Sequence, residues 1–414
     1  MENQYDIAIV GGGLVGASLA CALAGTDLRV VVIEAVPRKT QSQPGYDDRV
    51  LAIAPGSRRI LDTIGIWREI DAETVVPIKT IHISDRGKFG FTRLQHSKHG
   101  VEAMGYAVPA RELGVAVGRQ LQQLDGVTMM CPAEVTGLTR EKDGSEKFVE
   151  IKLSENSDPG KVCVSLVVFA DGADSAMCRS LNFETVGYKY NQSVILTTVT
   201  PDRSHNNTAY ERFTDSGPLA LLPSSNNRYT VVWTALDEQL PELLQCNDDE
   251  FLQRLQYRFG DRVGEMGKLG GRKTYPLSFV KVKHPVKNRV VVVGNAAHTI
   301  HPVAGQGFNL GLRDVATLAE VLFDAHAQEL DIGDIDVLDR YWRLRRRDID
   351  RVGRFTDGLI SLFSNDSLFL SLARDAALLS VDLIPPAQRF LVKRTMGLAG
   401  RLPRLSRGLP LGTR

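Results

Sequence analysis

The sequence predicts an α/β fold in which one dinucleotide-binding unit is assembled from separate parts of the chain. Three stretches support this prediction. Residues 5–34 have the pattern strand, glycine turn, helix and strand; residues 165–172 form an apolar strand that ends in Asp-Gly; and residues 290–325 run from a valine strand through a glycine-bearing loop into a long helix. Apolar strands that alternate with helical patterns are typical of a parallel sheet covered by helices.

The N-terminal stretch meets the demands of a dinucleotide one by one. Gly11 allows a sharp turn, Gly13 lets the backbone approach a pyrophosphate, and Gly16 lets the helix pack closely on the strand. The helix N-terminus adds free N–H groups and positive potential. Glu34 ends the second strand, where it can accept hydrogen bonds from an adenosine ribose, which disfavours NADP. The stretch predicts a Rossmann-like site for FAD or NAD; an ordinary tight turn is the alternative.

Length and composition describe a globular protein with a large core. The chain has 414 residues and a formal net charge of +1, which argues against a nucleic-acid-binding protein. Its five cysteines include no CxxC pair, so we expect no disulfide framework, no metal site and a reducing, cytoplasmic setting. The N-terminus lacks the basic start of a signal peptide. The longest apolar segment, 368–384, is too short for a membrane span because Arg374 and Asp375 interrupt it.

The segment after the second strand is polar and leads to Arg49. An arginine at this point can donate charge-assisted hydrogen bonds to a pyrophosphate; a surface salt bridge with Asp47 or Asp48 is the alternative. Residues 57–64 have a helical pattern, and residues 80–107 change to short alternating strands. We therefore expect an excursion into a second sheet.

Asp171 and Gly172 follow the apolar strand of the second stretch and form a turn signal on their own. From residue 187 to about 280 the pattern alternates again, so we expect further strands of the second sheet. The expected divisions are 1–75, 108–185 and 281–340 for the dinucleotide-binding unit, 76–107 and 186–280 for a substrate sheet inserted twice, and 341–414 for a C-terminal helical region with a basic tail.

The third stretch carries a second glycine-bearing loop, residues 301–309. Gly305 and Gly307 allow the backbone to approach a ligand, and the helix expected at 310–325 supplies positive potential at its N-terminus. One pyrophosphate does not need two helix N-termini. We therefore expect the first to bind phosphates and the second to face a redox ring that becomes anionic on reduction, as a flavin does.

These three stretches resemble, in identity and order, the single-component FAD-dependent aromatic hydroxylases. Residues 48–52 and 301–314 are similar to the ubiquinone-biosynthesis hydroxylase branch of that family, and residues 82–87, 211–214 and Asn295 are similar to the hydroxylases of 2-octaprenyl-6-methoxyphenol. The resemblance is weaker in the C-terminal part. It implies a Rossmann-like FAD-binding domain, an inserted mixed β-sheet substrate domain of the p-hydroxybenzoate hydroxylase type, and C-terminal helices.

The resemblance also implies an activity. The chain would be an FAD-dependent monooxygenase of ubiquinone biosynthesis that takes electrons from NAD(P)H and uses O2 to hydroxylate a polyprenylated phenol, with 2-polyprenyl-6-methoxyphenol converted to the 1,4-benzoquinol. The alternatives are a sibling hydroxylase acting at another ring position, a flavin-dependent reductase or oxidase of another isoprenoid, and a non-catalytic dinucleotide sensor. Because no second nucleotide motif occurs, we expect the nicotinamide donor to visit transiently.

The implied site residues fall into two groups. The candidate catalytic residues lie in a flavin-facing loop, with no general base assigned, and are Pro302, Gly305, Gln306 and Gly307. The candidate cofactor-binding residues are Gly11, Gly13, Gly16, Glu34, Arg49, Arg111, Asp171, Gly172, Gly294, Asn295, Gly305, Gly307 and Asn309. Arg111 is alternatively a helix-surface charge. Asn295 stands where the wider family has an aspartate bonded to the ribityl chain, and its amide oxygen can still accept that bond.

Two further sets of side chains could serve the chemistry. His298 and His301 suggest an acid or base, but hydroxylation needs a water-free site more than a titrating imidazole, so we assign neither. Phe213, Pro218 and Leu222 are expected to line the substrate pocket, because an aromatic ring needs a flat apolar wall. Core packing is the alternative for these three residues.

The C-terminal residues 389–414 include seven basic residues and no acidic ones, interleaved with apolar side chains. Such segregation suits an anionic membrane surface or another protein of ubiquinone synthesis, and a solvated tail is the alternative. We therefore expect a cytoplasmic protein at the inner face of the cytoplasmic membrane. The residues Arg343, Arg345, Arg346 and Arg347 predict a charged helix face.

Overall fold

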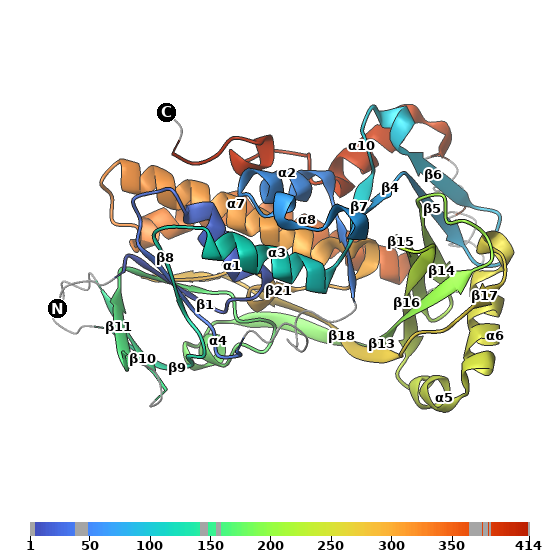
Figure 1. The fold of residues 1–414 in the computed structure, drawn as a ribbon, viewed down its shortest axis with the longest axis horizontal. Coiled ribbons are helices and arrows are strands. Elements are labelled where there is room, and N and C mark those ends of the chain that lie inside the picture. The colour runs from blue at the N-terminus through green and yellow to red at the C-terminus, as the bar shows by residue number, and fades with distance from the viewer. Residues whose placement is uncertain are drawn as a thin grey trace.

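The computed structural model describes residues 5–37, 49–140, 148–154, 159–363, 375, 380 and 382–412. Two main sheets stand at opposite ends of the molecule, and the long helices α7 (Gln306–Ala327) and α8 (Ile335–Phe363) run along the side between them (Figure 1). The α/β class with a mixed second sheet and C-terminal helices, predicted from the sequence, is confirmed.

The first sheet has the strand order β19-β20-β12-β1-β2-β8, and all neighbours are parallel except β19 and β20. Its strands are β1 (Ile7–Val10), β2 (Val30–Ile33), β8 (Val127–Met130), β12 (Leu166–Phe169), β19 (Val286–Lys287) and β20 (Val290–Val292). Helices α1 (Leu14–Leu23), α3 (Ala110–Gln122) and α7 cover one face. A three-stranded sheet of β9 (Val135–Arg140), β10 (Val149–Leu153) and β11 (Lys161–Val164) covers the other. Cover on both faces explains why the parallel strands are continuous apolar runs.

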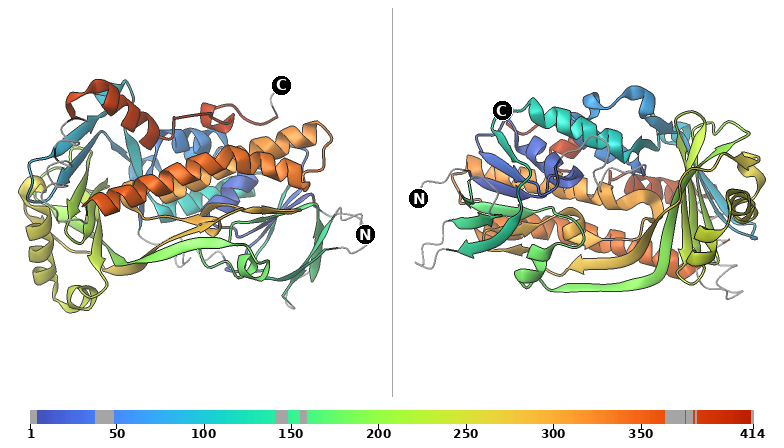
Figure 2. Two further views of the ribbon diagram at one scale, coloured as in Figure 1. Left: turned by 180° about the vertical axis from the view of Figure 1, so that it is seen from behind. Right: turned by 60° about the horizontal axis from the view of Figure 1, so that its bottom comes forward.

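The second sheet is mixed, with the order β21-β18-β13-β16-β15-β14-β5-β6 and with β17 paired to β13. Its strands are β5 (Thr80–Asp85), β6 (Phe91–Gln95), β13 (Thr185–Pro201), β14 (Thr208–Thr214), β15 (Gly217–Ser224), β16 (Arg228–Leu236), β17 (Met266–Gly267), β18 (Lys273–Val282) and β21 (His298–Thr299). Strands β13 and β18 are long enough to reach from this sheet toward the first one (Figure 2).

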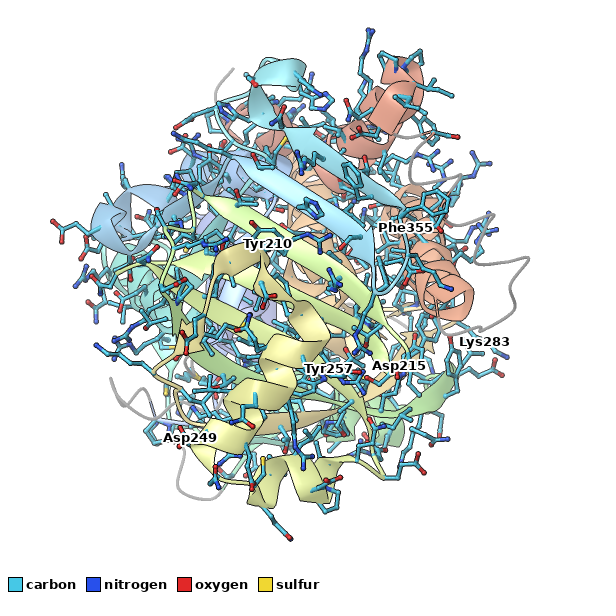
Figure 3. The ribbon with its side chains drawn as sticks, turned by 90° about the vertical axis from the view of Figure 1, so that its right-hand side faces the viewer. Tyr210, Asp215, Asp249, Tyr257, Lys283 and Phe355 are labelled. Atoms are coloured by element: carbon cyan, nitrogen blue, oxygen red, sulfur yellow. The ribbon has the colours of Figure 1, made fainter. Side chains whose placement is uncertain are left out.

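Two helices interrupt the stretch 187–280, where the sequence predicted strands throughout. They are α5 (Leu240–Gln245) and α6 (Asp248–Phe259). Asn247 caps α6 by accepting a hydrogen bond from the Glu250 backbone N–H at 2.9 Å. Phe251 and Phe259 of α6 pack against the outer face of the second sheet. Figure 3 shows α6 in front of these strands, with Tyr257 and Asp249 on it.

The remaining elements connect and cover the two sheets. A small sheet has the order β3-β7-β4, with β3 (Val50–Ile53), β4 (Val76–Ile78) and β7 (Gly105–Pro109). The other α-helices are α2 (Pro55–Thr63), α4 (Ala176–Ser180) and α10 (Pro385–Thr395). The short 3-10 helices are η1 (Trp67–Glu69), η2 (Ala72–Thr74), η3 (His96–His99), η4 (Asp261–Val263), η5 (Gly294–Ala296), η6 (Val303–Gly305) and η7 (Leu405–Arg407). Within the described residues, no helix has both the length and the apolar character that crossing a membrane requires.

The basic C-terminal segment folds back onto the long helix α7. Arg401 forms an ion pair with Glu320 at 3.3 Å, and Arg404 forms one with Asp324 at 3.2 Å. Leu405 is buried beside these pairs. Part of the segment's positive charge is therefore used within the fold.

Candidate functional site

The three glycine-bearing turns predicted from the sequence follow three adjacent parallel strands. Gly11 follows β1, Asp171 follows β12 and Gly294 follows β20, and these strands are neighbours in the order β20-β12-β1. Since the carboxyl ends of parallel strands meet at one edge, the three turns converge there. A Cβ atom on Gly11 would lie 2.7 Å from the Ala170 carbonyl oxygen, so the first two turns touch directly.

The glycines of the first turn differ in why glycine is present. A Cβ on Gly16 would lie 2.0 Å from the Gly11 carbonyl oxygen, so only glycine lets α1 pack this closely. Gly11 has a φ of +101°, in the region that favours glycine. Around Gly13, by contrast, no atom of the described residues lies within 4 Å of a built Cβ, and its φ of −66° suits any residue. Nothing in the described part of the chain requires glycine at position 13, which leaves this space for a ligand.

Glu34 is held against the first turn. Its Oε2 accepts a hydrogen bond from the Gly12 N–H at 2.6 Å, and its Oε1 accepts one from the Val36 N–H at 2.8 Å. A carboxylate has about four acceptor positions. Glu34 therefore keeps the capacity to accept further hydrogen bonds from ribose hydroxyl groups.

The Asp171–Gly172 turn lies beside the first turn. Burial raises the pKa of the Asp171 carboxyl, and the Ser175 hydroxyl and the Arg179 charge oppose this shift. Gly172 has a φ of +98°, so a side chain there would be strained. The turn thus places a carboxyl group, and backbone in a conformation that favours glycine, at the edge of the sheet.

Helices α1 and α7 bring their N-termini together. Built Cβ atoms on Gly294 and Gly311 would lie 3.0 Å and 2.9 Å from Val15 side-chain atoms, so η5 and the first turns of α7 both pack on the first turn of α1. Neither helix has an N-cap side chain among the described residues, and neither carries an acidic residue in its first turn. Two uncapped, positive helix ends therefore face the same region.

Helix α7 begins at Gln306, four residues before the predicted start at residue 310. Gly305 is its N-cap in the left-handed conformation, with a φ of +59°. Gly307 lies in the first turn, and within the described chain no atom comes within 4 Å of its built Cβ. The predicted start of the helix was wrong because Gly307 is a poor helix former, and the sequence pattern therefore favoured a start after it. Pro302 and Gly305 bound the 3-10 turn that leads into the helix.

Asn309 ties the loop of residues 301–309 to β3 and the segment after it. Its Oδ1 accepts a hydrogen bond from the Ala54 N–H at 2.8 Å. Its Nδ2 donates to the Ala52 oxygen at 2.8 Å and to the Gly305 oxygen at 2.7 Å. This arrangement fixes the loop through backbone atoms. Asn295 is exposed on η5, so its side chain is accessible to a ligand.

We expect Gly305→Ala to destabilise the protein by about 1–2 kcal/mol, because an alanine in the left-handed conformation is strained. Its Cβ would also lie 2.9 Å from the Ala52 Cβ. Gly307→Ala is the matched control, since its Cβ meets no described atom within 4 Å, and it should be at least as stable as the wild type. Denaturant unfolding measures both; equal stabilities for the two variants would show that the Gly305 conformation is not required.

A buried ionic network behind the loop was missed by the sequence analysis. Asp314, which is fully buried, accepts hydrogen bonds from the Gly294 N–H at 3.1 Å and from Arg345 Nε at 2.7 Å, and it bonds to His298 Nε2 at 2.6 Å. Arg345 also binds Asp348 at 2.6 Å. Arg345 is only 4% exposed, so the prediction of a charged helix face was wrong at this position. The adjacent, oppositely charged residues Arg313 and Asp314 are the sequence feature that could have indicated such a network.

The network holds Asp314 ionised. Burial acts to raise the pKa of the Asp314 carboxyl, but the neighbouring His298 and Arg345 outweigh it and lower the pKa to about 2. Burial likewise acts against ionisation of Asp348, and Arg345 and Arg313 lower its pKa. The turn that carries Gly294 is therefore held by the ionised carboxylate of Asp314, which accepts the hydrogen bond from the Gly294 N–H.

The two candidate histidines have different environments. His298 is engaged with Asp314, as described above. His301 is fully buried, and its Nδ1 accepts a hydrogen bond from the Val303 N–H at 3.2 Å, so the proton of a neutral ring resides on Nε2. No partner for that Nε2 is found among the described residues. The Tyr190 ring lies edge-on at 5.1 Å, and burial lowers the pKa of His301 to about 4.

We expect His301→Gln to reduce the acid sensitivity of the fold. Burial lowers the His301 pKa from 6.5 to about 4, so the unfolded state binds more protons than the folded state in that range. The stability contributed by neutral His301 is complete above pH 6.5 and is lost as the pH falls toward 4. Denaturant unfolding between these two pH values measures the effect. The wild type should lose more stability than the variant, and parallel losses would contradict the assignment.

The two candidate arginines lie on different elements. The guanidinium of Arg49 stands over the Tyr275 ring of β18, 5.1 Å from its centroid. Asp47 and Asp48, its alternative partners, lie outside the described residues. Arg111, in the first turn of α3, forms an ion pair with Glu112 at 3.3 Å and is mostly exposed. This is the geometry of a helix-surface charge.

The candidate pocket residues share one face of the second sheet. Leu219 of β15 is opposite Trp233, and both pack against α6. Because side chains alternate along a strand, Pro218 and Leu222 point to the opposite face, where Leu222 packs against a cluster that includes Ile78 and Val392. Phe213 is paired with Pro218 across the strands and so shares that inner face, where it is 2% exposed.

The arrangement fits FAD. Each uncapped helix end has a glycine whose built Cβ meets no described atom within 4 Å. These glycines are Gly13, the N-cap of α1, and Gly307, in the first turn of α7. The first can hold a pyrophosphate beside Glu34, and the second can face the ring system. The chain also brings together Gly11, Gly172 and Gly294, whose positive φ angles keep side chains out of the edge of the sheet.

Comparisons with known proteins support FAD as the cofactor. A model of the FAD binding domain family matches residues 4–356. Ubiquinone hydroxylase UbiL of Rhodospirillum rubrum is 40% identical, over 99% of this chain and 94% of its own length. The 3-demethoxyubiquinol 3-hydroxylase of Escherichia coli is 30% identical, over 96% of this chain and 100% of its own. The crystal structure of p-nitrophenol 4-monooxygenase PnpA from Pseudomonas putida DLL-E4 has a TM-score of 0.77 at 20% identity, covering 97% of this chain and 100% of that one.

Proposed function

Because this chain belongs to the FAD-dependent monooxygenase family that includes the ubiquinone hydroxylases, we propose that it hydroxylates 2-polyprenyl-6-methoxyphenol to the 1,4-benzoquinol. NAD(P)H is the reductant and O2 the co-substrate. The observation that carries the pathway is the 40% identity to a ubiquinone hydroxylase over nearly the whole chain.

FAD, when bound, accepts electrons from NAD(P)H and supplies the activation of O2. The residues of the chain bind it and keep it oriented. The free N–H groups at the start of α1 bind the pyrophosphate beside Gly13, and Glu34 accepts hydrogen bonds from the ribose. We assign Arg49 as a charge-assisted donor to the same phosphates, which it would reach by leaving the Tyr275 ring.

The loop from Pro302 to Gly307 carries the catalytic environment. The N-terminus of α7 would offer backbone N–H groups and positive potential to the ring system of a bound flavin. Gln306 is almost fully buried, and a loop packed in this way would limit the water that reaches a bound ring. His301 keeps its proton on Nε2, and we assign it no role as a general base.

The inner face of the second sheet forms the wall of the phenol pocket in this proposal. Phe213, Pro218 and Leu222 provide flat apolar surface, which suits an aromatic ring and leaves a hydroxylating site without competing water. The ring of the substrate lies between this wall and the flavin-facing loop. Asp171 and Asn295 remain candidate contacts to the cofactor from their exposed turns.

Hydroxylation at another position of the phenol ring is the second candidate function. The Escherichia coli relative is a 3-hydroxylase of 3-demethoxyubiquinol, so a related chain works at a different carbon. Mass spectrometry of quinone-pathway lipids in cells that lack this chain separates the two. We expect a polyprenyl-methoxyphenol to accumulate and ubiquinone to disappear. Accumulation of a later, demethoxylated intermediate would assign the chain to the sibling step and contradict the proposed position.

We also propose that the protein binds the inner face of the cytoplasmic membrane through α10. Phe390 is an exposed apolar side chain of α10, as are Leu383 and Ile384 just before the helix, and Arg389 and Lys393 are exposed on α10 beside Phe390. Apolar and basic side chains on one helix face suit an interface with anionic lipid. The opposite face of α10 is packed into the protein, so the helix presents this surface without unfolding.

Binding to anionic vesicles tests this membrane proposal. We expect Lys393→Gln to weaken binding about fivefold, since one basic residue contributes about 1 kcal/mol at such a surface. Lys161→Gln on β11 is the control, because β11 lies at the opposite end of the molecule (Figure 1). Equal losses for the two variants would remove α10 as the contact.

A further inference from the structure

Strand β13 is irregular where it passes the loop of residues 301–309. From Lys189 to Ser193 the chain advances four residues along β13, while its pairing advances only two along β18. Asn191, inside this bulge, has a φ of +54°, in the region that favours glycine. Extra residues in a strand bend it and re-aim a side chain, and such bulges are common next to active sites. Tyr190, which lies in the bulge, contacts the loop.

The ring of Tyr190 packs against His301. The two ring centroids are 5.1 Å apart and the ring planes meet at 88°, which is an edge-to-face arrangement. His301 is fully buried, and its Nδ1 accepts a hydrogen bond from the Val303 N–H at 3.2 Å. Val303 begins the 3-10 turn η6, which leads into α7. Tyr190 is therefore connected to this turn through one intermediate side chain.

The hydroxyl group of Tyr190 is held by helix α8. It donates a hydrogen bond to Asp357 Oδ1 at 2.5 Å. Burial, together with this bond to Asp357, raises the pKa of Tyr190 well above its usual value, so the hydroxyl keeps its proton. Gly353 lies one helical turn before Asp357, and a Cβ there would lie 3.2 Å from the Phe279 ring of β18. Glycine at this position thus lets α8 come close to the long strands (Figure 2, left).

The contacts run without a gap from Asp357 of α8, through Tyr190 and His301, to the turn before α7. They differ from the two supports described above, which join the loop to β3 and the Gly294 turn to Asp314. A ring that only filled space would need neither a hydroxyl group nor a carboxylate to hold it. The polar bond at the outer end of the series indicates that the orientation of the ring matters.

We propose that Tyr190 is a positioning residue for the flavin-facing loop: it holds His301, and through His301 the turn at residues 302–305, in the shape that sets the N-terminus of α7 against the flavin ring. The proposal rests on the proposed function, since it takes this helix end to face a flavin. The role involves no contact between Tyr190 and the reacting atoms. Its loss should therefore change the surroundings of the ring rather than the binding of the phenol.

Amide hydrogen exchange of the FAD-free protein tests the series of contacts without the cofactor. Tyr190→Phe keeps the ring and removes the hydroxyl group, and Asp357→Leu removes the acceptor of the same bond. We expect both to raise the exchange rate of the Val303 amide at least about fivefold. Asp357→Asn, which keeps an acceptor oxygen, should stay close to the wild type. Wild-type exchange in both Tyr190→Phe and Asp357→Leu would overturn the proposal.

The bound flavin shows whether the series positions the ring. Tyr190→Phe and Asp357→Leu should shift the flavin absorbance maxima in the same direction. They should also lower the yield of hydroxylated phenol per NAD(P)H oxidised at least about threefold, because a small displacement of a reacting group is costly, with the KM for the phenol changed by less than about twofold. Asp357→Asn should keep the wild-type spectrum and yield.

Tyr229→Phe is the matched control. It also removes a tyrosine hydroxyl that donates a hydrogen bond, to the Thr208 oxygen at 3.1 Å, but in the cluster between the second sheet and α6. This variant should keep the wild-type flavin spectrum and yield. A Tyr190→Phe flavoprotein that matches Tyr229→Phe in both properties would overturn the proposal, even if exchange at the turn had increased.

These measurements separate failure of the positioning role from failure of the proposed function. If the wild type oxidises NAD(P)H but hydroxylates no phenol, the proposed function fails, and the flavin spectrum still decides the role of Tyr190. A spectrum shifted in both Tyr190→Phe and Asp357→Leu would then support the positioning role at a flavin with other chemistry. An unshifted spectrum would overturn it.

Discussion

Replacing Gly13 by valine should give a folded protein that has lost its FAD. In the folded chain no described atom lies within 4 Å of the built Cβ, and the backbone angles φ −66° and ψ −176° suit a β-branched residue. The valine methyl groups would instead fill the space beside the α1 N-terminus that a pyrophosphate needs. We expect FAD affinity to fall at least about a hundredfold, equivalent to about 2.7 kcal/mol. Absorbance of the purified protein and fluorescence titration with FAD measure the loss.

Two further variants make this result specific. Gly137→Val lies in strand β9, where a built Cβ also meets no described atom within 4 Å, and it should retain FAD. Gly16→Ala should instead destabilise the protein, because its Cβ would lie 2.0 Å from the Gly11 oxygen. A yellow, fully loaded Gly13→Val protein would contradict the nucleotide assignment of the first turn.

Arg345→Met should be the most destabilising change in the ionic network. It leaves Asp314 fully buried with the Gly294 N–H and His298 as its remaining partners. Removing one member of a buried ion pair costs about 3–5 kcal/mol, since the other charge remains desolvated. Denaturant unfolding should show this loss. The exposed neighbour Arg346 provides the control, and Arg346→Met should change stability by less than about 0.5 kcal/mol.

A double variant tests the cause of the loss. Asp314→Asn removes the charge that Arg345→Met leaves unpaired. If the buried charge causes the destabilisation, the double variant will be more stable than the sum of the two single losses predicts. Additive losses, or a value for Arg345→Met close to that for Arg346→Met, would contradict the proposed anchoring of the Gly294 turn.

The parts of the fold predicted correctly depend on short-range patterns. The strand, turn and helix around Gly11, Gly13 and Gly16 were predicted correctly, because the glycine spacing and the flanking apolar runs are local features of the sequence. The convergence of the Asp171 and Gly294 turns on it follows from parallel strand order, which apolar runs indicate. Neighbouring strands β20, β12 and β1 give that order in the structure.

The features that were missed depend on tertiary contacts. Arg345 and Asp314 are 31 residues apart, and an arginine-rich helix has the same sequence pattern whether one arginine is buried or none is. Helix α6 was missed because it lies within a stretch dominated by strands. Its apolar residues Phe251 and Phe259 are buried by contact with the sheet, which the local sequence does not indicate.

The most direct test of the central claim uses the purified flavoprotein with a farnesylated methoxyphenol, NADPH or NADH, and isotopically labelled O2. A ring hydroxylase should consume reductant and place one labelled oxygen atom on the ring of the product, as mass spectrometry detects. Oxidation of the reductant with no label in the phenol would contradict ring hydroxylation. It would leave a flavin-dependent reductase or oxidase as the function of this site.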